Sequence, residues 1–276
     1  MMFESQPSRT HMRNISLNTI DAVPRDVLAI GTDYPPNVLL SAHEHRRAQF
    51  LYGATGLIEV STADGEWVIP PDCGVWIPAQ TLHETRMLNV STRSLYIEPT
   101  VAPRQSRKCE VLRVSRLLRQ LLLEAVDIPL EYDLHGREGI LIQLILHEVA
   151  RAKPLPFFAP IPRDTHLATL CREFLTAPHI TSLPQEWAKK LHKSERSFSR
   201  FFSAQTGLSF SNWRQQACLL NAITNISAGK SITEVAFDLG YCNVGSFSTM
   251  FKKWLGQPPS SFIQQIDESS LLIGCN

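Results

Sequence analysis

From Leu183 to Trp213 the chain reads LPQEWAKKLHKSERSFSRFFSAQTGLSFSNW, and from Ile232 to Phe262 it reads ITEVAFDLGYCNVGSFSTMFKKWLGQPPSSF. These two stretches contain the same unit twice. Residues 198–202 (FSRFF) correspond to residues 247–251 (FSTMF), 49 positions later, and further matching residues follow the same offset. Repetition at a fixed period marks a supersecondary unit that is used more than once. The duplication therefore predicts the architecture of the C-terminal region.

Each copy is predicted to form two short helices across a tight turn. In the first copy, Trp187, Ala188 and Leu191 give the first helix an apolar face, Ser194 caps the second helix, and Gly207 ends it. In the second copy the same roles fall to Ile232, Val235, Ala236, Leu239, Asn243 and Gly256. Phenylalanines turn one face of each second helix toward a core. This is the helix-turn-helix pattern, in which the second helix enters the major groove of DNA.

With the phenylalanines buried, the free face of each second helix is polar. Arginine can hold a guanine edge through two hydrogen bonds, and Ser, Thr and Asn can reach bases or phosphates. The alternative is that these are ordinary solvated residues on surface helices. Two copies at matching spacing favour DNA binding. The candidate DNA-binding residues are Arg196, Ser199, Arg200, Ser203, Asn243, Gly245, Ser246, Thr249, Lys252 and Lys253.

The second copy also carries a family signature, in Ile232, Val235-Ala236, Leu239-Gly240-Tyr241, Ser246-Phe247-Ser248, Phe251-Lys252-Lys253, Gly256 and Pro259. Through these residues about the last hundred positions resemble the DNA-binding domain of the AraC/XylS family of bacterial transcription regulators. The resemblance implies a regulator that binds a double-stranded DNA operator. The chain departs from the family at Cys218, Thr249 and Ile263, where arginine is usual. Because these arginines are missing, we expect the first copy, which retains Arg200, to contribute more of the DNA contacts.

The whole chain is also similar to a subgroup of that family. Its members are enterobacterial regulators that repress a neighbouring efflux gene for nitroimidazole-type drugs. The similarity implies a repressor of a neighbouring transporter gene and of its own gene.

Length and charge are consistent with a DNA-binding module on a separate domain. The 276 residues favour two domains. The net charge is only +1, but residues 163–264 hold eleven Lys and Arg against six Asp and Glu, so this part carries +5 and the rest −4. A basic module suits phosphate binding. The six cysteines form no C-x-x-C pair and no apolar run is long enough to span a bilayer, which predicts a soluble cytoplasmic protein with no membrane partner.

Short apolar runs alternate with Gly and Pro between residues 26 and 105. Such spacing predicts a small antiparallel barrel or jelly roll, and Asp64-Gly65 is expected to turn a hairpin. The runs expected to be strands are 27–30, 38–40, 49–52, 57–60, 67–69, 75–77 and 94–97. The predicted fold class is therefore α+β multidomain: an N-terminal cupin-like β-barrel plus helices, and a C-terminal all-α domain with two helix-turn-helix units.

The barrel region resembles the two cupin motifs, through His43-Glu44-His45, Gln49, Pro71, Gly74, Pro78 and His83. His43 and His45 are expected on one strand face, and His83 on the opposite hairpin. Three imidazoles could bind a divalent transition metal such as Zn, Ni, Fe or Mn. The other interpretations are a pocket without metal and purely structural histidines. The candidate ligand-binding residues for a small-molecule effector are His43, His45, Gln49, Trp76 and His83.

An enzyme is the main alternative from another class. A cupin metalloenzyme, a dioxygenase or an isomerase, could carry a DNA-binding tail. Cupin enzymes usually have Glu where this chain has Gln49, a neutral and weaker ligand, so the sequence favours a regulator. A constitutive architectural DNA-binding protein is disfavoured by the pocket histidines.

The remaining segments complete the expected domain organisation. Helices are predicted at 106–128 and 136–152, and they either pair two subunits in a homodimer, as the family resemblance implies, or pack on the barrel. The prolines of 153–162 predict an extended linker. A long helix from Ser209 or Ser211 to Ala228 is expected between the two units. The expected divisions are an N-terminal arm (1–25), a sensing barrel (26–105), a helical dimerisation segment (106–152), a linker (153–162), a DNA-binding domain (163–265) and a tail (266–276).

Overall fold

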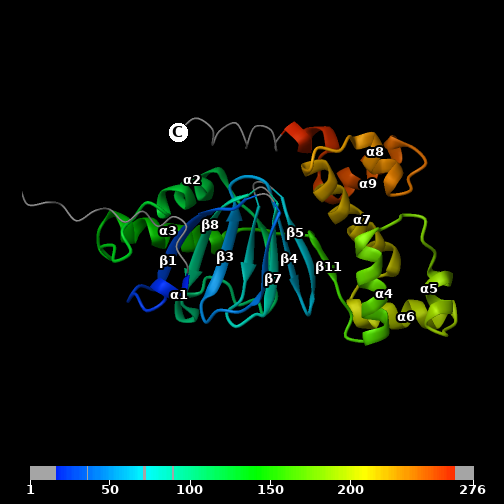
Figure 1. Ribbon diagram of the computed structural model, residues 1–276, viewed down its shortest axis with the longest axis horizontal. Helices are drawn as coiled ribbons and strands as arrows, with labels where there is room; N and C mark the ends of the chain where they lie inside the picture. Colours follow the sequence, from blue (N-terminus) through cyan, green and yellow to red (C-terminus); the bar gives the residue numbers. More distant parts are fainter. Residues whose placement is uncertain (1–16, 36, 71–72, 89, 265–276) are drawn as a thin grey trace, which may run out of the picture.

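The computed structural model describes residues 17–35, 37–70, 73–88 and 90–264. A domain built on two β-sheets is followed by an all-helical domain (Figure 1). The predicted α+β fold class is confirmed. The tail at 266–276 and residues 1–16 of the expected arm lie outside the described residues.

Two antiparallel sheets form the N-terminal domain. Their strand orders are β1-β8-β3-β6-β9-β10 and β11-β5-β4-β7-β2. The strands are β1 (Val27–Asp33), β2 (Val38–His43), β3 (Ala48–Gly53), β4 (Leu57–Thr62), β5 (Gly65–Ile69), β6 (Cys73–Ile77), β7 (His83–Leu88), β8 (Ser91–Ile97), β9 (Glu110–Arg113), β10 (Pro154–Leu155) and β11 (Phe158–Pro160). A short helix, α1 (Leu17–Ile20), precedes the first strand, and a 3-10 turn, η1 (Pro99–Val101), follows β8.

The predicted runs are strands, but two parts of the prediction were wrong. Residues 83–88 form β7, which was not predicted as a strand. The helix expected at 106–128 is shorter, because residues 110–113 form β9 and only α2 (Arg116–Ala125) is helical. Val111 pairs with Val75 of β6, so its β-branched side chain fills a place in the sheet. Ser115 then caps α2 by accepting a hydrogen bond from the Leu118 amide at 3.0 Å.

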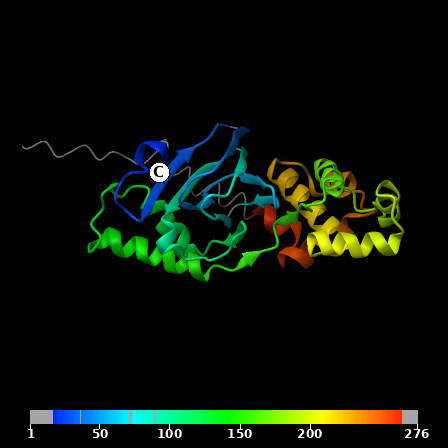
Figure 2. The same ribbon diagram turned by 90° about the horizontal axis from the view of Figure 1, so that it is seen from below.

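Helices α2 and α3 (Arg137–Arg151) cover the outer face of the first sheet. Leu118 and Leu122 of α2 and Ile145 of α3 are fully buried in a cluster with Phe50 of β3 and Trp76 of β6. Both views show these helices at the side of the barrel away from the helical domain (Figure 1, Figure 2).

The segment expected to be a linker is extended, as predicted, but it belongs to both sheets. Strand β10 pairs with β9, and β11 pairs with β5. Both lie at sheet edges, where proline is tolerated because one side of the strand needs no amide donor. The β4–β5 hairpin is confirmed, but its two turn residues are Ala63 and Asp64, one position earlier than the predicted Asp64-Gly65. Gly65 opens β5, and an added Cβ there would lie 2.3 Å from the Phe158 ring, so glycine lets β11 approach.

The described part of the C-terminal domain contains six labelled helices and a further helical segment at residues 259–264. The labelled helices are α4 (Thr165–Thr176), α5 (Pro184–Lys190), α6 (Glu195–Thr206), α7 (Phe210–Ser227), α8 (Ile232–Asp238) and α9 (Val244–Leu255). The predicted long helix is α7, capped by Ser209 and ended at Ala228. Its middle is buried between the two helix-turn-helix units, which attach to its opposite ends. The indole of Trp213 donates a hydrogen bond to the Pro160 carbonyl at 2.9 Å, so α7 also holds β11.

Candidate DNA-binding surface and effector pocket

The first helix-turn-helix unit consists of α5 and α6. Phe198 and Phe202 of α6 are fully buried and pack against Trp187 of α5. Ser194 caps α6 by accepting a hydrogen bond from the Ser197 amide at 3.3 Å, and Gly207 ends the helix in the left-handed conformation. The stripe opposite the core is fully exposed and consists of Arg196, Ser199, Arg200 and Ser203.

The second unit consists of α8 and α9 and has the same construction. Phe247 and Phe251 are buried, and Gly256 ends α9. The side chain of Asn243 accepts a hydrogen bond from the Ser246 amide at 2.8 Å, so it is engaged as the helix cap. The Thr249 hydroxyl donates to the Gly245 carbonyl at 2.9 Å. The predicted residues of this unit are all exposed: Asn243, Gly245, Ser246, Thr249, Lys252 and Lys253.

The charged side chains of the two stripes differ in their surroundings. Arg196 and Arg200 form no ion pair within the described part of the chain. The Lys253 amine lies 3.3 Å from the Gln215 side-chain oxygen on α7 and 5.5 Å from the centre of the Trp254 ring. The first unit therefore offers two guanidinium groups that no carboxylate of the described residues pairs with, whereas Lys253 is held toward α7.

The two turns differ in length, which the repeat pattern did not predict. The caps of the first helices, Leu183 and Ser231, are 48 residues apart, whereas the caps of the second helices, Ser194 and Asn243, are 49 apart. The second turn is therefore one residue longer.

The three histidines of the barrel converge. His43 ends β2, His83 begins β7, and the ring centres of His43 and His83 are 4.4 Å apart. His45 lies in the loop after β2, not on its strand face as expected, and its ring centre is 5.2 Å from that of His83. His83 is buried, His45 is half-buried and His43 is exposed, so the cluster leads from the barrel interior to the surface.

The hydrogen bonds of the three rings show which ring nitrogen carries the proton. In each ring Nδ1 faces a backbone carbonyl oxygen, that of Ser41, Arg47 or Thr81, at 2.8, 2.5 and 2.8 Å. A carbonyl only accepts, so Nδ1 carries the proton in each ring. Nε2 of a neutral His43 or His83 is then left as an acceptor, whereas Nε2 of His45 faces the Gln49 side-chain oxygen. Burial lowers the pKa of His83 to about 4 and also lowers the pKa of His45. These two rings are neutral at pH 7.

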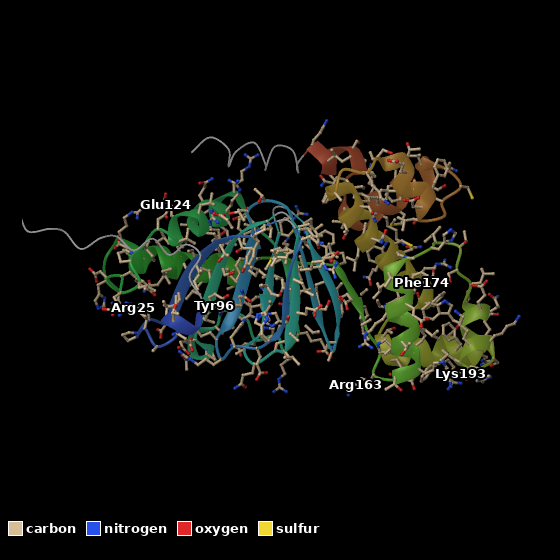
Figure 3. All side chains as sticks on the ribbon, in the orientation of Figure 1. Arg25, Tyr96, Glu124, Arg163, Phe174 and Lys193 are labelled. Carbon is tan, nitrogen blue, oxygen red and sulfur yellow. The ribbon has the colours of Figure 1, made fainter. Side chains whose placement is uncertain are left out.

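Gln49 continues the cluster into the barrel. Its amide nitrogen donates to the hydroxyl groups of Ser94 and Tyr96 at 3.1 Å each, and its oxygen lies 3.2 Å from Nε2 of His45. Tyr96 lies in the barrel, well separated from Lys193 in the turn of the first helix-turn-helix unit (Figure 3). The pocket and the DNA-binding surface therefore occupy distant parts of the molecule.

Trp76 does not belong to this pocket. Side chains alternate along a strand, and Trp76 points to the face of the first sheet that α2 and α3 cover. The interior face carries its neighbours Val75 and Ile77. The prediction of Trp76 as a ligand-binding residue was therefore wrong. Pro71 of the cupin-like motif lies outside the described residues.

Metal binding by His43, His45 and His83 stays a prediction. The ring tautomer suits it, because a ligating imidazole donates its other nitrogen to a carbonyl or carboxylate. In the described residues, however, no three His, Cys, Asp or Glu side chains are placed so as to hold an ion.

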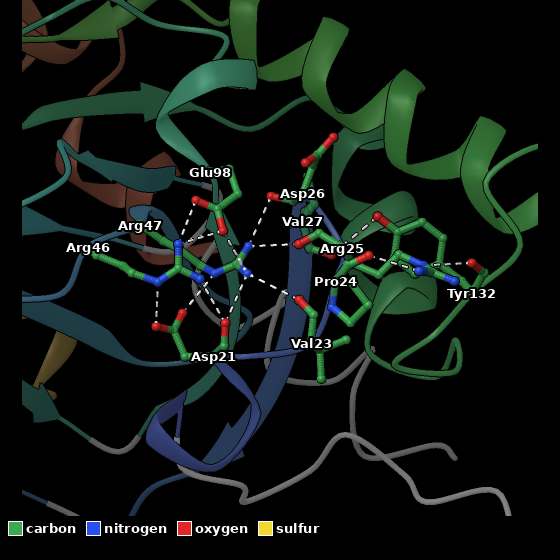
Figure 4. A network of polar contacts seen from close by, with 10 residues as sticks. All are labelled: Asp21, Val23, Pro24, Arg25, Asp26, Val27, Arg46, Arg47, Glu98 and Tyr132. Carbon is green, nitrogen blue, oxygen red and sulfur yellow. Dashed lines mark hydrogen bonds and ion pairs between the residues drawn. The ribbon is translucent and has the colours of Figure 1, made fainter.

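A buried arginine next to the pocket was not predicted. Arg47 is 1% exposed and binds the segment before β1. It donates to the Asp21 carboxylate at 2.8 Å and the Arg25 carbonyl at 2.9 Å, and pairs with Glu98 at 2.9 Å (Figure 4). Partial burial acts to raise the pKa of Asp21, but hydrogen bonds from the two arginines lower it overall. The sequence offered only an Arg46-Arg47 pair after the histidine motif.

A cavity of about 460 Å³ lies between the second sheet and the helical domain. Strands β4, β5 and β7 contribute Glu59, Glu66 and Glu84, and α4 contributes Arg172. On the other side lie Leu220 and Thr224 of α7. Burial, together with the carboxylates of Glu59 and Glu84, raises the pKa of Glu66 to about 7. The two domains therefore meet across a carboxyl-rich contact.

A barrel with a cluster of histidines, joined to two helix-turn-helix units with exposed polar stripes, defines a DNA-binding transcription regulator with a ligand-binding domain. Two family models match the chain: an AraC-like ligand binding domain at residues 26–149 and a helix-turn-helix domain at residues 187–265. Among the described helices, none is both long and apolar enough for a membrane span.

Two similar proteins are named as transcription regulators, and one solved structure is similar at low identity. The HTH-type transcriptional regulator NimR of Escherichia coli strain K12 is 30% identical over 225 residues, 81% of this chain and 82% of NimR. The uncharacterized HTH-type transcriptional regulator YobQ of Bacillus subtilis strain 168 is 25% identical over 80% of this chain and 88% of YobQ. A crystal structure of ToxT from Vibrio cholerae is 10% identical over 87% of this chain and 99% of that chain, with a TM-score of 0.37. The chain belongs to the AraC family of transcription regulators, and is not an enzyme.

Proposed function

We propose that the chain is an effector-controlled repressor that inserts α6 and α9 into successive major grooves of an operator in the cytoplasm. The DNA-binding part is residues 163–265. The observation that carries this proposal is the pair of equivalent helices, each with a buried phenylalanine face and an exposed polar stripe, held by one buried helix. Arg196 and Arg200 suit base edges, and the lysines of α9 suit phosphates.

The proposed sensing part is the barrel (26–105), with His43, His45, Gln49 and His83 lining the effector pocket. Nε2 of His83, and of His43 when neutral, is an acceptor. Such a pocket favours a small molecule that carries hydrogen-bond donors, such as hydroxyl or amine groups, or a divalent metal ion. The exposed position of His43 supplies the entrance.

The regulated genes are proposed to be a neighbouring transporter (efflux) gene and the regulator's own gene. This proposal rests on the resemblance of the whole chain to repressors of efflux genes, and the 30% identity to NimR is consistent with it.

A homodimer is proposed through α2 and α3. Leu117, Ile140 and Leu144 are 49%, 62% and 39% exposed on these helices, although the same helices also pack on the barrel. Exposed apolar side chains gathered on neighbouring helices favour association. We expect Ile140→Glu to reduce the mass measured by light scattering to that of a monomer.

Footprinting tests the proposal directly. The full chain should protect two half-sites on one face of the DNA that flanks its gene, with centres about 34 Å apart. Inserting about 5 base pairs between them turns one half-site to the other face, and should abolish protection of the pair. Inserting a full turn of about 10 base pairs keeps both half-sites on one face but roughly doubles their separation, so it should also weaken protection of the pair if α7 fixes the spacing. Undiminished binding to the half-turn variant would contradict the paired-groove geometry.

A further inference from the structure

We infer that the loop between α4 and α5, residues 177–183, is a second connection between the two helix-turn-helix units, and that His179 is the residue that positions α9. This inference rests on the proposed role of α6 and α9 in DNA binding. Helix α7 is the connection that the sequence predicts. The loop is a separate one, because it leaves α4 and touches the turn of the second unit before it enters the first unit.

The contact with the second unit centres on Gly240, in the turn before α9. The His179 ring lies directly over this glycine: a Cβ added to Gly240 would be 2.1 Å from Cε1 of His179. Gly240 also has a φ of +80°, so the turn needs glycine for its backbone as well as for the ring. Beside it, the Ile180 amide donates a hydrogen bond to the Leu239 carbonyl at 2.8 Å. A side-chain contact and a backbone bond therefore hold this turn.

The ring of His179 is itself held in place. Its Nδ1 lies 2.7 Å from the Thr181 hydroxyl, within hydrogen-bond distance. This contact within the loop fixes the plane of the ring against Gly240.

The contact with the first unit centres on Ser182, three residues after His179 in the loop. Its hydroxyl accepts a hydrogen bond from the Trp187 indole at 3.1 Å, and Trp187 is buried in the core of the first unit. Its carbonyl accepts a hydrogen bond from Arg214 on α7. Its amide donates to the His179 carbonyl at 3.2 Å, which closes the loop on itself. The loop therefore transmits the position of the first core to the second turn.

Such a second connection restricts a motion that α7 alone permits. Each unit could turn about its end of α7, and this would change the spacing and angle between α6 and α9. Binding of two half-sites would then have to select one arrangement from many, which lowers affinity. Gly240 lies three residues before Asn243, the cap of α9, so a shift of this turn moves the helix directly. The loop therefore presets the helices for one half-site spacing.

A distance measurement on the free protein tests the connection without DNA. Spin labels go on the full chain at Ala204→Cys of α6 and Thr233→Cys of α8, both exposed, with Cys242 and Cys275 changed to Ser. In electron–electron double resonance, His179→Ala should broaden the distance distribution about twofold, because one contact to the turn is lost. His179→Phe, which keeps a flat ring over Gly240 but loses the contact with Thr181, should narrow the distribution only part of the way back to wild type. His166→Ala, an exposed histidine on α4, is the matched control.

DNA binding then tests the consequence. His179→Ala should weaken binding to the paired operator about tenfold, the loss expected for roughly one contact of 1.4 kcal/mol, and should bind isolated half-sites unchanged. On operators whose spacer is one base pair longer or shorter, His179→Ala should lose less affinity than the wild-type protein does. Thr181→Val, which removes only the contact within the loop, should act in the same direction, and it serves as the test if His179→Ala fails to fold.

The distance measurement and the DNA-binding measurement distinguish a failure of this inference from a failure of the proposed function. An unchanged distance distribution in both His179→Ala and Thr181→Val overturns the inference, whatever the DNA result. A wild-type protein that binds no paired site overturns the proposed function, while the distance measurement still tests the connection.

Discussion

The hydroxyl of Thr224 on α7 donates a hydrogen bond of 3.2 Å to the carboxylate of Glu59 on β4, across the boundary between the DNA-binding helices and the barrel. Glu59 lies opposite Arg86 of β7 and forms an ion pair with it at 3.7 Å. Strand β7, which carries Arg86, begins at His83, one of the residues of the proposed effector pocket. A single strand thus joins the pocket to the residues that contact the DNA-binding domain.

We expect Thr224→Val to weaken the effector response while operator binding without effector stays within about twofold of wild type. Valine keeps the shape of the side chain and removes the hydroxyl donor, so one contact that can distinguish two domain arrangements is lost. The effector concentration for half-release in a gel-shift titration should change by about 2- to 10-fold. Thr233→Val, on the surface of α8, is the control. An unchanged dose response would show that this contact carries no coupling.

Arg200→Ala should reduce specificity more than Lys253→Ala. A guanidinium that grips a base edge is worth about 1–3 kcal/mol of discrimination. Lys253 is held toward α7, and we place it near phosphates, so its loss should weaken all sequences alike and lower the salt slope by about one charge. Competition between operator and random DNA at several salt concentrations measures both effects. An equal loss on specific and random DNA for Arg200→Ala would contradict its role in base recognition.

His45→Ala and His83→Ala should remove the effector response and leave the effector-free footprint unchanged. The His45 ring centre lies 5.3 Å from that of Tyr96 and 5.2 Å from that of His83, and Figure 3 shows Tyr96 in the barrel, far from Lys193 in the first helix-turn-helix unit. A reporter fused to the regulated promoter measures the response, and footprinting measures the binding. If a metal occupies the pocket, elemental analysis of the triple alanine variant should also show its loss, since Gln49 alone cannot hold it. A normal dose response in that variant would reduce the histidines to structural parts of the barrel.

Glu66→Gln should remove a pH dependence of stability between about pH 4.5 and 7. Burial raises the pKa of Glu66 in the folded state to about 7 from an ordinary value of 4.5. In this window the folded state binds more protons than the unfolded state, so stability falls as pH rises and levels off above pH 7. At pH 8 the glutamine variant should be more stable by on the order of 1–3 kcal/mol, seen as a higher melting temperature. Parallel curves for both proteins from pH 5 to 8 would contradict this.

Arg47→Met should destabilise the fold far more than Arg46→Met. Arg47 is buried, and its loss removes the donor to the Arg25 and Asp26 carbonyls and leaves Asp21 and Glu98 with only Arg46 as an ion-pair partner, a cost of about 3–5 kcal/mol. Arg46 pairs with the same carboxylates at 2.7 and 2.6 Å but is half-exposed, and its loss should cost about 1 kcal/mol or less. Urea denaturation of both variants provides the comparison. Similar losses would show that solvent reaches the network.

The sequence by itself determined the elements whose signals are local. Ser194, Asn243, Gly207 and Gly256 mark the ends of α6 and α9, because caps and left-handed stops depend on neighbours a few residues away. The 49-residue repeat and the phenylalanine spacing were enough for both helix-turn-helix units and their exposed stripes. The histidine motif was enough to indicate a pocket in the barrel.

Only the tertiary structure decided what depends on residues distant in the chain. Val111 and Leu112 belong to a strand because β6 and β10 lie beside them, although the local leucine pattern predicted a helix. Trp76 faces α2 and α3 rather than the pocket, since the register of β6 sets the side of the sheet on which each residue falls. The proline segment pairs with both sheets, and His179 meets Gly240 across 61 residues of chain. These contacts follow from packing between elements, and no local pattern encodes them.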